Sequence, residues 1–355
     1  MKKRSTEEIT EVVGMDIGDR YSHLAVLDVK TGKLLERSRF RTTQSAIRSR
    51  FDGTSRLRIA LEVGTHSPWI SQLLAELGHE VIVANARKLR LIYENRNKDD
   101  QLDAEYLARL ARVDPKLLSP VQHGSAQAQA DLAVLRARQV LVRSRTRLIL
   151  HCQGVAKSYG LRIPVGSSST FVRRLAEVLP ESLEPALGPL METLTRLCQQ
   201  IHAYDRQLER LAAERYPETQ LLRQIRGVGP ITALAFALIL QDPRRFACSR
   251  DVGAYLGLVP ARRESGQSRP QLRIRKEGNR MLRQLLVQCA HYMMGPFGED
   301  CDLRRFGERL KARGGAAAHK RAIVAVARKL SILLHHLWAT GEVYDPSYSA
   351  RAQAA

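Results

Sequence analysis

The stretch Val12-Val13-Gly14-Met15-Asp16-Ile17-Gly18 decides how this chain begins to fold. It is an apolar run, and a polar bend at 19–21 joins it to a second apolar run at 22–28. Two short apolar runs across a polar bend are typical of a β-hairpin. An unpaired carboxylate among apolar neighbours is costly to bury, so Asp16 requires a partner.

After the hairpin, short apolar runs alternate with helical patterns. A third strand is expected at 33–41 and a helix at 43–51. A strand at 57–64 closed by glycine, a helix at 68–77 and a strand at 80–84 follow. Strands joined by crossover helices predict a mixed α/β sheet.

The rest of the chain has helical patterns. Apolar residues recur at helical spacing from 126 to about 155, and a second series follows steps of four and three: Leu190, Leu194, Leu197, Ile201, Tyr204, Leu208 and Leu211. Such a series is typical of a coiled-coil seam. We expect self-association through this helix, with pairing to the 126–155 helix as a second arrangement and an ordinary bundle helix as the alternative. A further, mostly helical segment is interrupted by a polar loop at 260–275.

These patterns predict an α/β plus α fold with four parts. They are an α/β domain at 1–124, a helical coiled-coil region at 125–217, a mostly helical domain at 218–345 and a tail at 346–355.

The composition narrows the class of partner. The 355 residues contain 57 Lys and Arg against 36 Asp and Glu, a net charge of +21 that points to a polyanion. No run approaches the roughly 18 apolar residues that a membrane span requires, and no apolar core of a signal peptide follows Met1, so a cytoplasmic location is expected. The five cysteines form no CxxC pair, so any metal ion is expected on oxygen ligands.

Four acidic residues from three separate elements could form such a site. Glu62 ends the 57–64 strand, and Asp100 and Asp103 are three residues apart at the head of a helix, on one face. Together with Asp16 they could enclose two divalent ions, an arrangement suited to phosphodiester chemistry. The helix acids could instead only complement the helix dipole, and Asp99 leaves the register of the third acid open.

Two features of the third segment favour nucleic-acid contact. Gly227 and Gly229 lie in a turn like that of a helix-hairpin-helix, where a helix start offers N–H groups to a phosphate; the alternative is a plain turn. Between 261 and 283 there are eight Lys or Arg against two Glu and no aromatic residue. This suits phosphate contacts better than base stacking, with a solvated basic face as the alternative. The contacts are predicted at Arg262, Arg263, Arg269, Arg273, Arg275, Lys276 and Arg283.

A serine lies within the same basic loop. Ser265 precedes Gly266, and a hydroxyl among guanidinium groups could attack a phosphodiester. Ser-Gly is also ordinary turn chemistry, and Ser268 is a competing candidate.

Several of these motifs, taken in order over about residues 12–300, resemble one family, the Asp-Glu-Asp-Asp (DEDD) transposases of the insertion sequence 110 (IS110) group. They are Gly14-Met15-Asp16-Ile17-Gly18, Leu61-Glu62-Val63-Gly64-Thr65, Lys98-Asp99-Asp100-Gln101-Leu102-Asp103-Ala104, Gly227-Val228-Gly229-Pro230, Tyr255-Leu256-Gly257-Leu258-Val259-Pro260, Ser265-Gly266 and Gly278-Asn279. The resemblance implies a RuvC-like domain of the ribonuclease H fold at 1–124, coiled-coil helices, and a C-terminal transposase domain with a catalytic serine. It also places Asn279 at the nucleic-acid contact.

The resemblance further implies a mechanism. Asp16, Glu62, Asp100 and Asp103 would bind Mg²⁺, and Ser265 would attack DNA and become transiently linked to it. A structured guide RNA from the element, the bridge or seeker RNA, would pair with target and donor DNA. The expected protein is a bacterial RNA-guided recombinase that excises and inserts its own element, a dimer at least and a tetramer on DNA, associated with the nucleoid when active.

Three other classes of protein share some of these features. An actin-like sugar kinase would need a second Asp-x-Gly-x-Thr loop, which the sequence lacks. A RuvC-like junction-resolving nuclease would use only the acidic site and not Ser265. A non-catalytic nucleic-acid-binding protein would leave the four acids unexplained.

Overall fold

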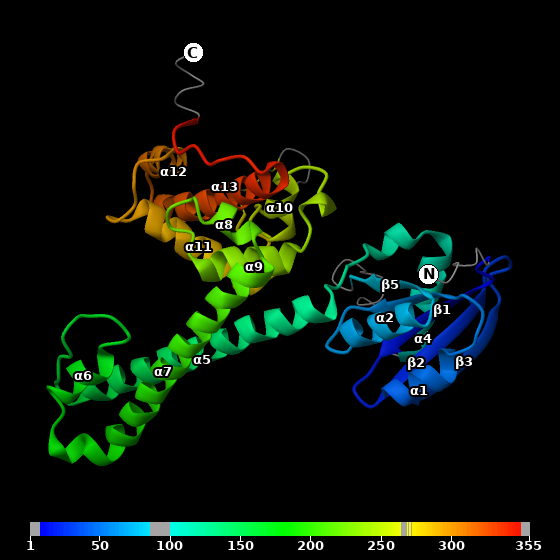
Figure 1. The fold of residues 1–355 in the computed structure, drawn as a ribbon, viewed down its shortest axis with the longest axis horizontal. Coiled ribbons are helices and arrows are strands. Elements are labelled where there is room, and N and C mark those ends of the chain that lie inside the picture. The colour runs from blue at the N-terminus through cyan, green and yellow to red at the C-terminus, as the bar shows by residue number, and fades with distance from the viewer. Residues whose placement is uncertain (1–7, 86–99, 264–267, 269, 271, 349–355) are drawn as a thin grey trace. The chain divides into compact units, whose positions relative to one another are not determined.

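A computed structural model describes residues 8–85, 100–263, 268, 270 and 272–348 (Figure 1). The chain divides into two compact units, 1–123 and 124–355, which are described separately.

The first unit is a five-stranded mixed sheet with helices on both faces. Its strands lie in the order β3-β2-β1-β4-β5, with β1, β2 and β3 antiparallel and β4 and β5 parallel to β1. The α/β architecture predicted for this part is therefore confirmed. In chain order the elements are β1 (Glu11–Ile17), β2 (Tyr21–Asp28), β3 (Leu34–Arg41), α1 (Gln44–Phe51), β4 (Arg58–Glu62), α2 (Ser67–Glu76), β5 (Glu80–Ala84), α4 (Asp100–Val113) and the 3-10 turn η2 (Pro115–Leu118).

Alternation along the strands divides the core of this unit into two layers. Val13 and Met15 of β1 pack on the side of α1 and α2, with Phe51 and Ile70. Val12 packs on the opposite side, against α4. Successive strand residues face opposite ways, so β1 buries both of its faces, as a central strand does.

A buried histidine makes the stability of this unit depend on pH. The backbone N–H of Leu57 donates to His79 Nδ1 (3.3 Å), and Nε2 donates to the carbonyl oxygen of Phe51 (3.1 Å). Burial lowers the pKa of His79, so the neutral ring is the folded form.

Acidification is therefore expected to destabilise the first unit. The folded pKa of His79 lies below its unfolded value, so stability is full above about pH 6.5 and is lost as the pH falls from there towards the folded pKa. Thermal melts between about pH 7.5 and pH 5 should show a falling midpoint. The fall should be shallower in His79→Gln and unchanged in the control His151→Gln, whose histidine is exposed. An equal slope in all three proteins would contradict this assignment.

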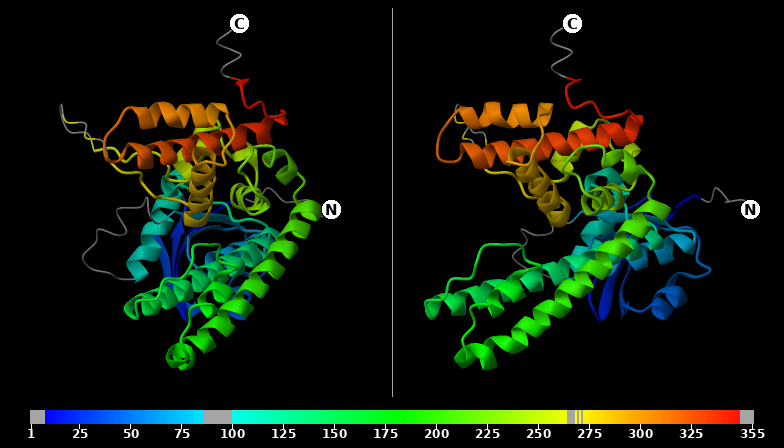
Figure 2. Two further views of the ribbon diagram at one scale, coloured as in Figure 1. Left: turned by 90° about the vertical axis from the view of Figure 1, so that its left-hand side faces the viewer. Right: turned by 60° about the vertical axis from the view of Figure 1, so that its left-hand side comes forward.

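The second unit consists of a long helical hairpin and a compact helical core (Figure 2). Its α-helices are α5 (Ala126–Ser158), α6 (Phe171–Ala176), α7 (Glu184–Arg215), α8 (Glu218–Leu222), α9 (Pro230–Leu240), α10 (Arg250–Tyr255), α11 (Arg280–Met294), α12 (Asp302–Ala312) and α13 (Ala318–Thr340). The 3-10 turns are η3 (Glu181–Leu183) and η4 (Pro243–Arg245).

The seam on α7 packs against α5 of the same chain. Leu187, Leu194, Ile201 and Leu208, seven residues apart, are buried. This is the second of the two arrangements expected for the seam. The base of the hairpin, including Leu208, shares one core with α9, α11 and α13.

The helix α13 is a core helix of this unit. Within the described ranges it alone has the length and mean hydropathy of a membrane span, and half of that stretch is buried. Ala322, Val326, Leu330 and Leu334 on it are inaccessible to solvent. Their burial against the other helices accounts for its apolar character.

A buried carboxylate joins the two helices of the hairpin at its base. Asp131 of α5, which is 3% exposed, accepts hydrogen bonds from Gln127 Nε2 (2.9 Å), Arg215 Nη1 (2.9 Å) and the Tyr216 hydroxyl (2.8 Å). Burial and the bond to Asp131 raise the pKa of Tyr216 well above its usual range.

Replacing this carboxylate is expected to destabilise the second unit. Asp131→Ala leaves the half-buried Tyr216 hydroxyl without its acceptor, which costs about 1–3 kcal/mol, while Arg215 is exposed to water and keeps its hydration. The control Asp205→Ala removes a more exposed partner of Arg138 and should cost about 1 kcal/mol or less. Urea unfolding of both variants measures the difference, and equal losses would contradict it.

Candidate active site

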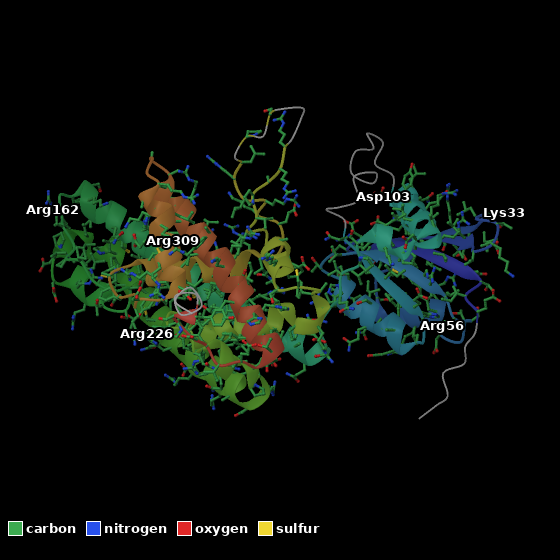
Figure 3. All side chains as sticks on the ribbon, turned by 90° about the horizontal axis from the view of Figure 1, so that it is seen from above. Lys33, Arg56, Asp103, Arg162, Arg226 and Arg309 are labelled. Atoms are coloured by element: carbon green, nitrogen blue, oxygen red, sulfur yellow. The ribbon has the colours of Figure 1, made fainter. Side chains whose placement is uncertain are left out.

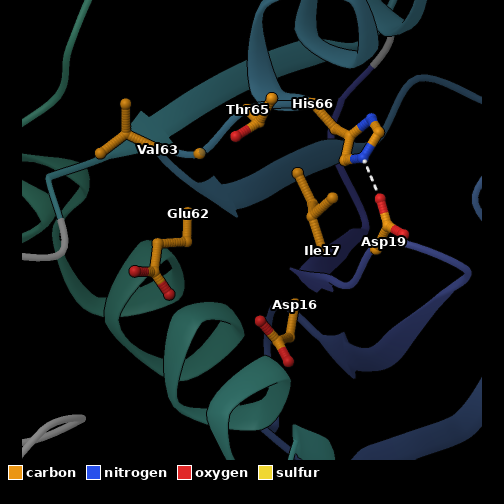
Figure 4. A pocket seen from close by; sticks show the side chains of 8 residues that line it. Asp16, Ile17, Asp19, Glu62, Val63, Thr65 and His66 are labelled. Atoms are coloured by element: carbon orange, nitrogen blue, oxygen red, sulfur yellow. Dashed lines mark hydrogen bonds and ion pairs between the residues drawn. The ribbon is translucent and has the colours of Figure 1, made fainter. Parts of the chain in front are cut away.

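Two carboxylates lie side by side at the C-terminal ends of β1 and β4, two neighbouring inner strands of the sheet. β1 and β4 are parallel neighbours with Met15 paired to Leu61, so Asp16 and Glu62 are the next residues on the two strands. Val12 and Ala60, which pack on the α4 side, lie an even number of residues before them. Both acids therefore lie on the face that α4 covers, as Figure 4 shows.

Gly14 sets the position of α4 on this face. A Cβ atom on Gly14 would lie 1.8 Å from the carbonyl oxygen of Ala104 and 2.6 Å from the backbone nitrogen of Ala108, so only glycine permits this close packing. The buried carboxylate of Glu105 holds the helix further, because it accepts from Arg37 of β3 and from Arg109 Nε (2.8 Å). The bond from Arg37 is the main cause of the lowered pKa of Glu105.

The direction of α4 brings its first turn to the strand ends that carry the acids. Arg58, at the start of β4, bonds the carbonyl oxygen of Ala111 near the end of α4 (3.4 Å), while Ala104 lies over Gly14. The helix therefore runs against β1 and β4. Asp103 lies in the first turn and is partly exposed (Figure 3). Asp100 is the first residue of α4, and its side chain lies outside the described part.

A Cβ on Gly14 is expected to disrupt this arrangement. Gly14→Ala would force α4 away from the sheet, and overpacking of this kind costs about 1–3 kcal/mol, occasionally more. The control Gly64→Ala has no atom within 4 Å of its new Cβ and should keep wild-type stability. Thermal melts and DNA-cleavage rates of both variants test this, and a wild-type melt for Gly14→Ala would contradict it.

Asp16 and Glu62 line an open cavity of about 340 Å³. Its walls come from the ends of β1 and β4 and the loops that follow them: Asp16, Ile17, Asp19, Glu62, Val63, Gly64, Thr65 and His66. The wall is formed at the strand ends, where parallel strands of an α/β sheet commonly present their ligand sites.

The donor set fits a hard divalent cation. Mg²⁺ prefers oxygen ligands and is usually bound by one or two carboxylates together with substrate phosphates and water. Asp16 and Glu62 supply two carboxylates on an open cavity, with the first turn of α4 beside them. Among the described side chains no three His, Cys, Asp or Glu come close enough to hold a metal ion by themselves.

His66 was not among the predicted site residues. Its Nε2 lies 3.3 Å from Asp19 Oδ1, and its Nδ1 accepts a hydrogen bond from Trp69 Nε1 (3.1 Å). The spacing of three residues between His66 and Trp69 at a helix start was the available signal.

The buried Ser67 hydroxyl fixes the loop that follows Glu62. The Ser67 hydroxyl donates to the carbonyl oxygen of Gly64 (2.9 Å) and accepts from the Gly64 N–H (3.0 Å). His123 Nε2 lies 2.9 Å from the same hydroxyl, and burial lowers the pKa of His123. This network holds the cavity wall in place.

In the second unit, the glycine turn joins α8 to α9. Gly227 has φ of +95°, and a Cβ there would lie 2.8 Å from the ring of Tyr292. Gly229 caps α9 and is exposed, with open space around it. Arg226 beside the turn is exposed (Figure 3) and pairs with Glu299 (2.8 Å).

The basic loop begins and ends as a two-stranded ribbon. Ala261 N–H donates to the carbonyl oxygen of Arg273 (2.9 Å), and Arg275 N–H to that of Val259 (3.0 Å). Five of the predicted contacts are exposed here: Arg262, Arg263, Arg273, Arg275 and Lys276. Ser268 is exposed as well. Ser265 and Arg269 lie outside the described residues.

Two of the predicted nucleic-acid contacts make structural bonds within the protein. The side chain of Arg283 is buried, and its Nη1 donates to the carbonyl oxygens of Leu256 (2.9 Å) and Glu277 (2.6 Å). Asn279 caps α11, with its Oδ1 accepting from the N–H of Leu282 (3.0 Å). Both hold the end of the basic loop on the helical core.

Comparison with known proteins identifies the family of this chain. The family model DEDD_Tnp_IS110, described as "Transposase", matches residues 13–160, and that described as "Transposase IS116/IS110/IS902 family" matches residues 219–299. The chain is similar to the transposase for insertion sequence element IS1328 of Yersinia enterocolitica, with 31% identity over 290 residues, 80% of this chain and 84% of the relative. It is also similar to the transposase for insertion sequence element IS1111A of Coxiella burnetii, with 31% identity over 260 residues, 71% and 70% of the two chains. The chain therefore belongs to the IS110 family of DEDD transposases and is an enzyme of DNA strand transfer.

Proposed function

We propose that this transposase is an RNA-guided recombinase that excises and inserts its own mobile element through a covalent phosphoserine–DNA intermediate. The observation that carries the proposal is the meeting of Asp16, Glu62 and the first turn of α4 at one sheet edge. The sheet order, with three antiparallel strands followed by two parallel ones, supports assigning residues 1–124 to a RuvC-like domain of the ribonuclease H fold. Residues 218–345 are then the transposase domain that carries the serine.

Asp16 and Glu62, with Asp100 and Asp103 of α4, are the residues that would hold Mg²⁺. When bound, the ion supplies charge stabilisation to a phosphodiester whose oxygens are being exchanged. Other residues of this chain hold the acidic side chains in position. The Gly64–Ser67–His123 network fixes the cavity wall beside Glu62, and Gly14 fixes the first turn of α4.

Ser265 is the proposed nucleophile. Its hydroxyl oxygen forms a bond to phosphorus, the bond from phosphorus to one strand oxygen breaks, and the proton of the serine is passed on so that the strand leaves as a hydroxyl. Exposed Arg262, Arg263 and Arg273 in the same loop supply positive charge for the phosphate. The reverse step with a second strand end restores the serine and completes the exchange.

The guide RNA and the oligomer are part of the proposal. The net charge of +21 supports a large polyanionic partner. Such a partner would be the element's own RNA, held by a dimer that becomes a tetramer on DNA at the bacterial nucleoid.

Copurification tests the proposed function. The protein is expressed with its native flanking DNA, the purified complex is digested with protease, and the remaining nucleic acid is sequenced. A discrete RNA derived from the element is the expected result. Heterogeneous nucleic acid that washes off in high salt would instead favour a transposase guided by the protein itself, or a RuvC-like junction-resolving nuclease that uses only the acidic site.

A further inference from the structure

One side chain of the acidic cavity is a hydrogen-bond donor with a fixed direction. His66 follows the loop after β4 and precedes α2, and it lines the cavity together with Asp16 and Glu62 (Figure 4). Its backbone is helical, and its side chain makes no capping bond to α2. The imidazole is therefore available to the cavity.

Trp69 determines which nitrogen of His66 carries the proton. The indole N–H can only donate, and it donates to His66 Nδ1 (3.1 Å), so Nδ1 is the acceptor of a neutral ring. The proton then lies on Nε2, the atom directed at Asp19. The two rings are also packed edge to face, with centroids 6.2 Å apart and an interplanar angle of 86°. One turn of local structure thus fixes both the tautomer and the ring direction.

The present partner of Nε2 is weakly held. The distance to Asp19 Oδ1 is 3.3 Å, longer than a typical bond to a carboxylate, and the Asp19 side chain is 92% exposed. A partner so exposed to water is readily exchanged for another oxygen acceptor. A phosphodiester entering a cavity lined by the carboxyl groups of Asp16 and Glu62 needs hydrogen-bond donors as well as a cation.

We propose that His66 Nε2–H donates to a non-bridging oxygen of the DNA phosphate bound at the acidic cavity, in exchange for Asp19, and that Trp69 is the positioning residue of His66. The start of α2 lies directly after His66 and adds the positive end of a helix dipole on the same side. The proposal rests on the proposed function only in taking this cavity as the place where DNA is cut.

Three variants separate the effects of the hydrogen-bond donor of His66, of its aromatic ring and of its positioning by Trp69. His66→Phe keeps an aromatic ring against Trp69 and lacks the donor, so DNA cleavage should fall about 100- to 1,000-fold, the range for loss of one preorganised donor. His66→Gln keeps an N–H at a similar reach and should stay within about fivefold of wild type. Trp69→Phe keeps the ring packing and removes the bond to Nδ1, so its loss should fall between these two.

Nitrogen-15 spectra of the histidine-labelled full chain supply a readout besides activity. The His66 signals, assigned by their loss in His66→Gln, should show an Nε2–H tautomer in the wild type and a mixture of tautomers in Trp69→Phe. Addition of a short DNA duplex without divalent metal should shift the wild-type Nε2 signal.

The outcomes separate this inference from the proposed function. An Nδ1–H tautomer in the wild type, or wild-type cleavage by folded His66→Phe while Asp16→Asn is inactive, would overturn the role of His66 and leave the acidic site intact. Full cleavage by Asp16→Asn would overturn the proposed site itself. Thermal melts show whether each variant is folded.

Discussion

Asp16→Asn should reduce DNA strand cleavage by more than about a thousandfold, because it removes a metal-binding carboxylate and keeps the size of the side chain. The register places this carboxylate beside Glu62 on the α4 face of the sheet, so one ligand of a small set is lost. The fold should survive. The measurement is the single-turnover cleavage rate with Mg²⁺, together with the rise in melting temperature that Mg²⁺ causes, which should be smaller in the variant.

Asp19→Asn is the matched control for Asp16→Asn. Asp19 lines the same cavity, but its side chain is 92% exposed, and asparagine keeps an oxygen acceptor for His66. Its cleavage rate should stay within about threefold of wild type, since exposed substitutions have small effects. Wild-type activity of Asp16→Asn, or equal loss in both variants, would refute the assignment of the metal site.

Ser265→Ala should abolish the covalent protein–DNA adduct and lower strand exchange by at least about a thousandfold, since alanine has no nucleophile. Binding of DNA and of copurified RNA should persist, because the exposed arginines of the same loop remain. The adduct is detected on denaturing gels after reaction with labelled DNA, and binding is measured at a fixed salt concentration.

Ser268→Ala is the matched control for the nucleophile. Ser268 is an exposed hydroxyl three residues further along the same loop, so its variant should form the adduct at a normal rate. Loss of the adduct in Ser268→Ala alone would transfer the role to Ser268. Strand cleavage without any adduct in Ser265→Ala would favour the junction-resolving nuclease.

Most elements of the first unit could be predicted from the sequence, because the strands other than β3 are short apolar runs, most of them closed by a polar bend or glycine. The pairing of β1 with β4 could not, since they are separated by two strands and a helix and no local pattern encodes their register. The same holds for α7. Its apolar seam could be read from the sequence, but the sequence did not decide whether the seam packs against a second copy or against α5 of the same chain.

The site divides in the same way. Asp16 stood out because its charge is surrounded by apolar residues. Arg283 resembled its basic neighbours in sequence, but its place in the first turn of α11 buries it against backbone carbonyls. For His66 the sequence shows only the spacing to Trp69, and the role proposed for it depends on a bond to Trp69 and on a cavity formed by two separate loops.

The sequence by itself determined the alternation of strands and helices, the positive charge and the family, because these depend on residue types and short spacings. Only the tertiary structure decided that Asp16 and Glu62 are neighbours, that Gly14 brings the start of α4 beside them, and which of the basic side chains are exposed. These are contacts between residues tens of positions apart. They follow from how strands pair and helices pack, which the order of residue types does not express locally.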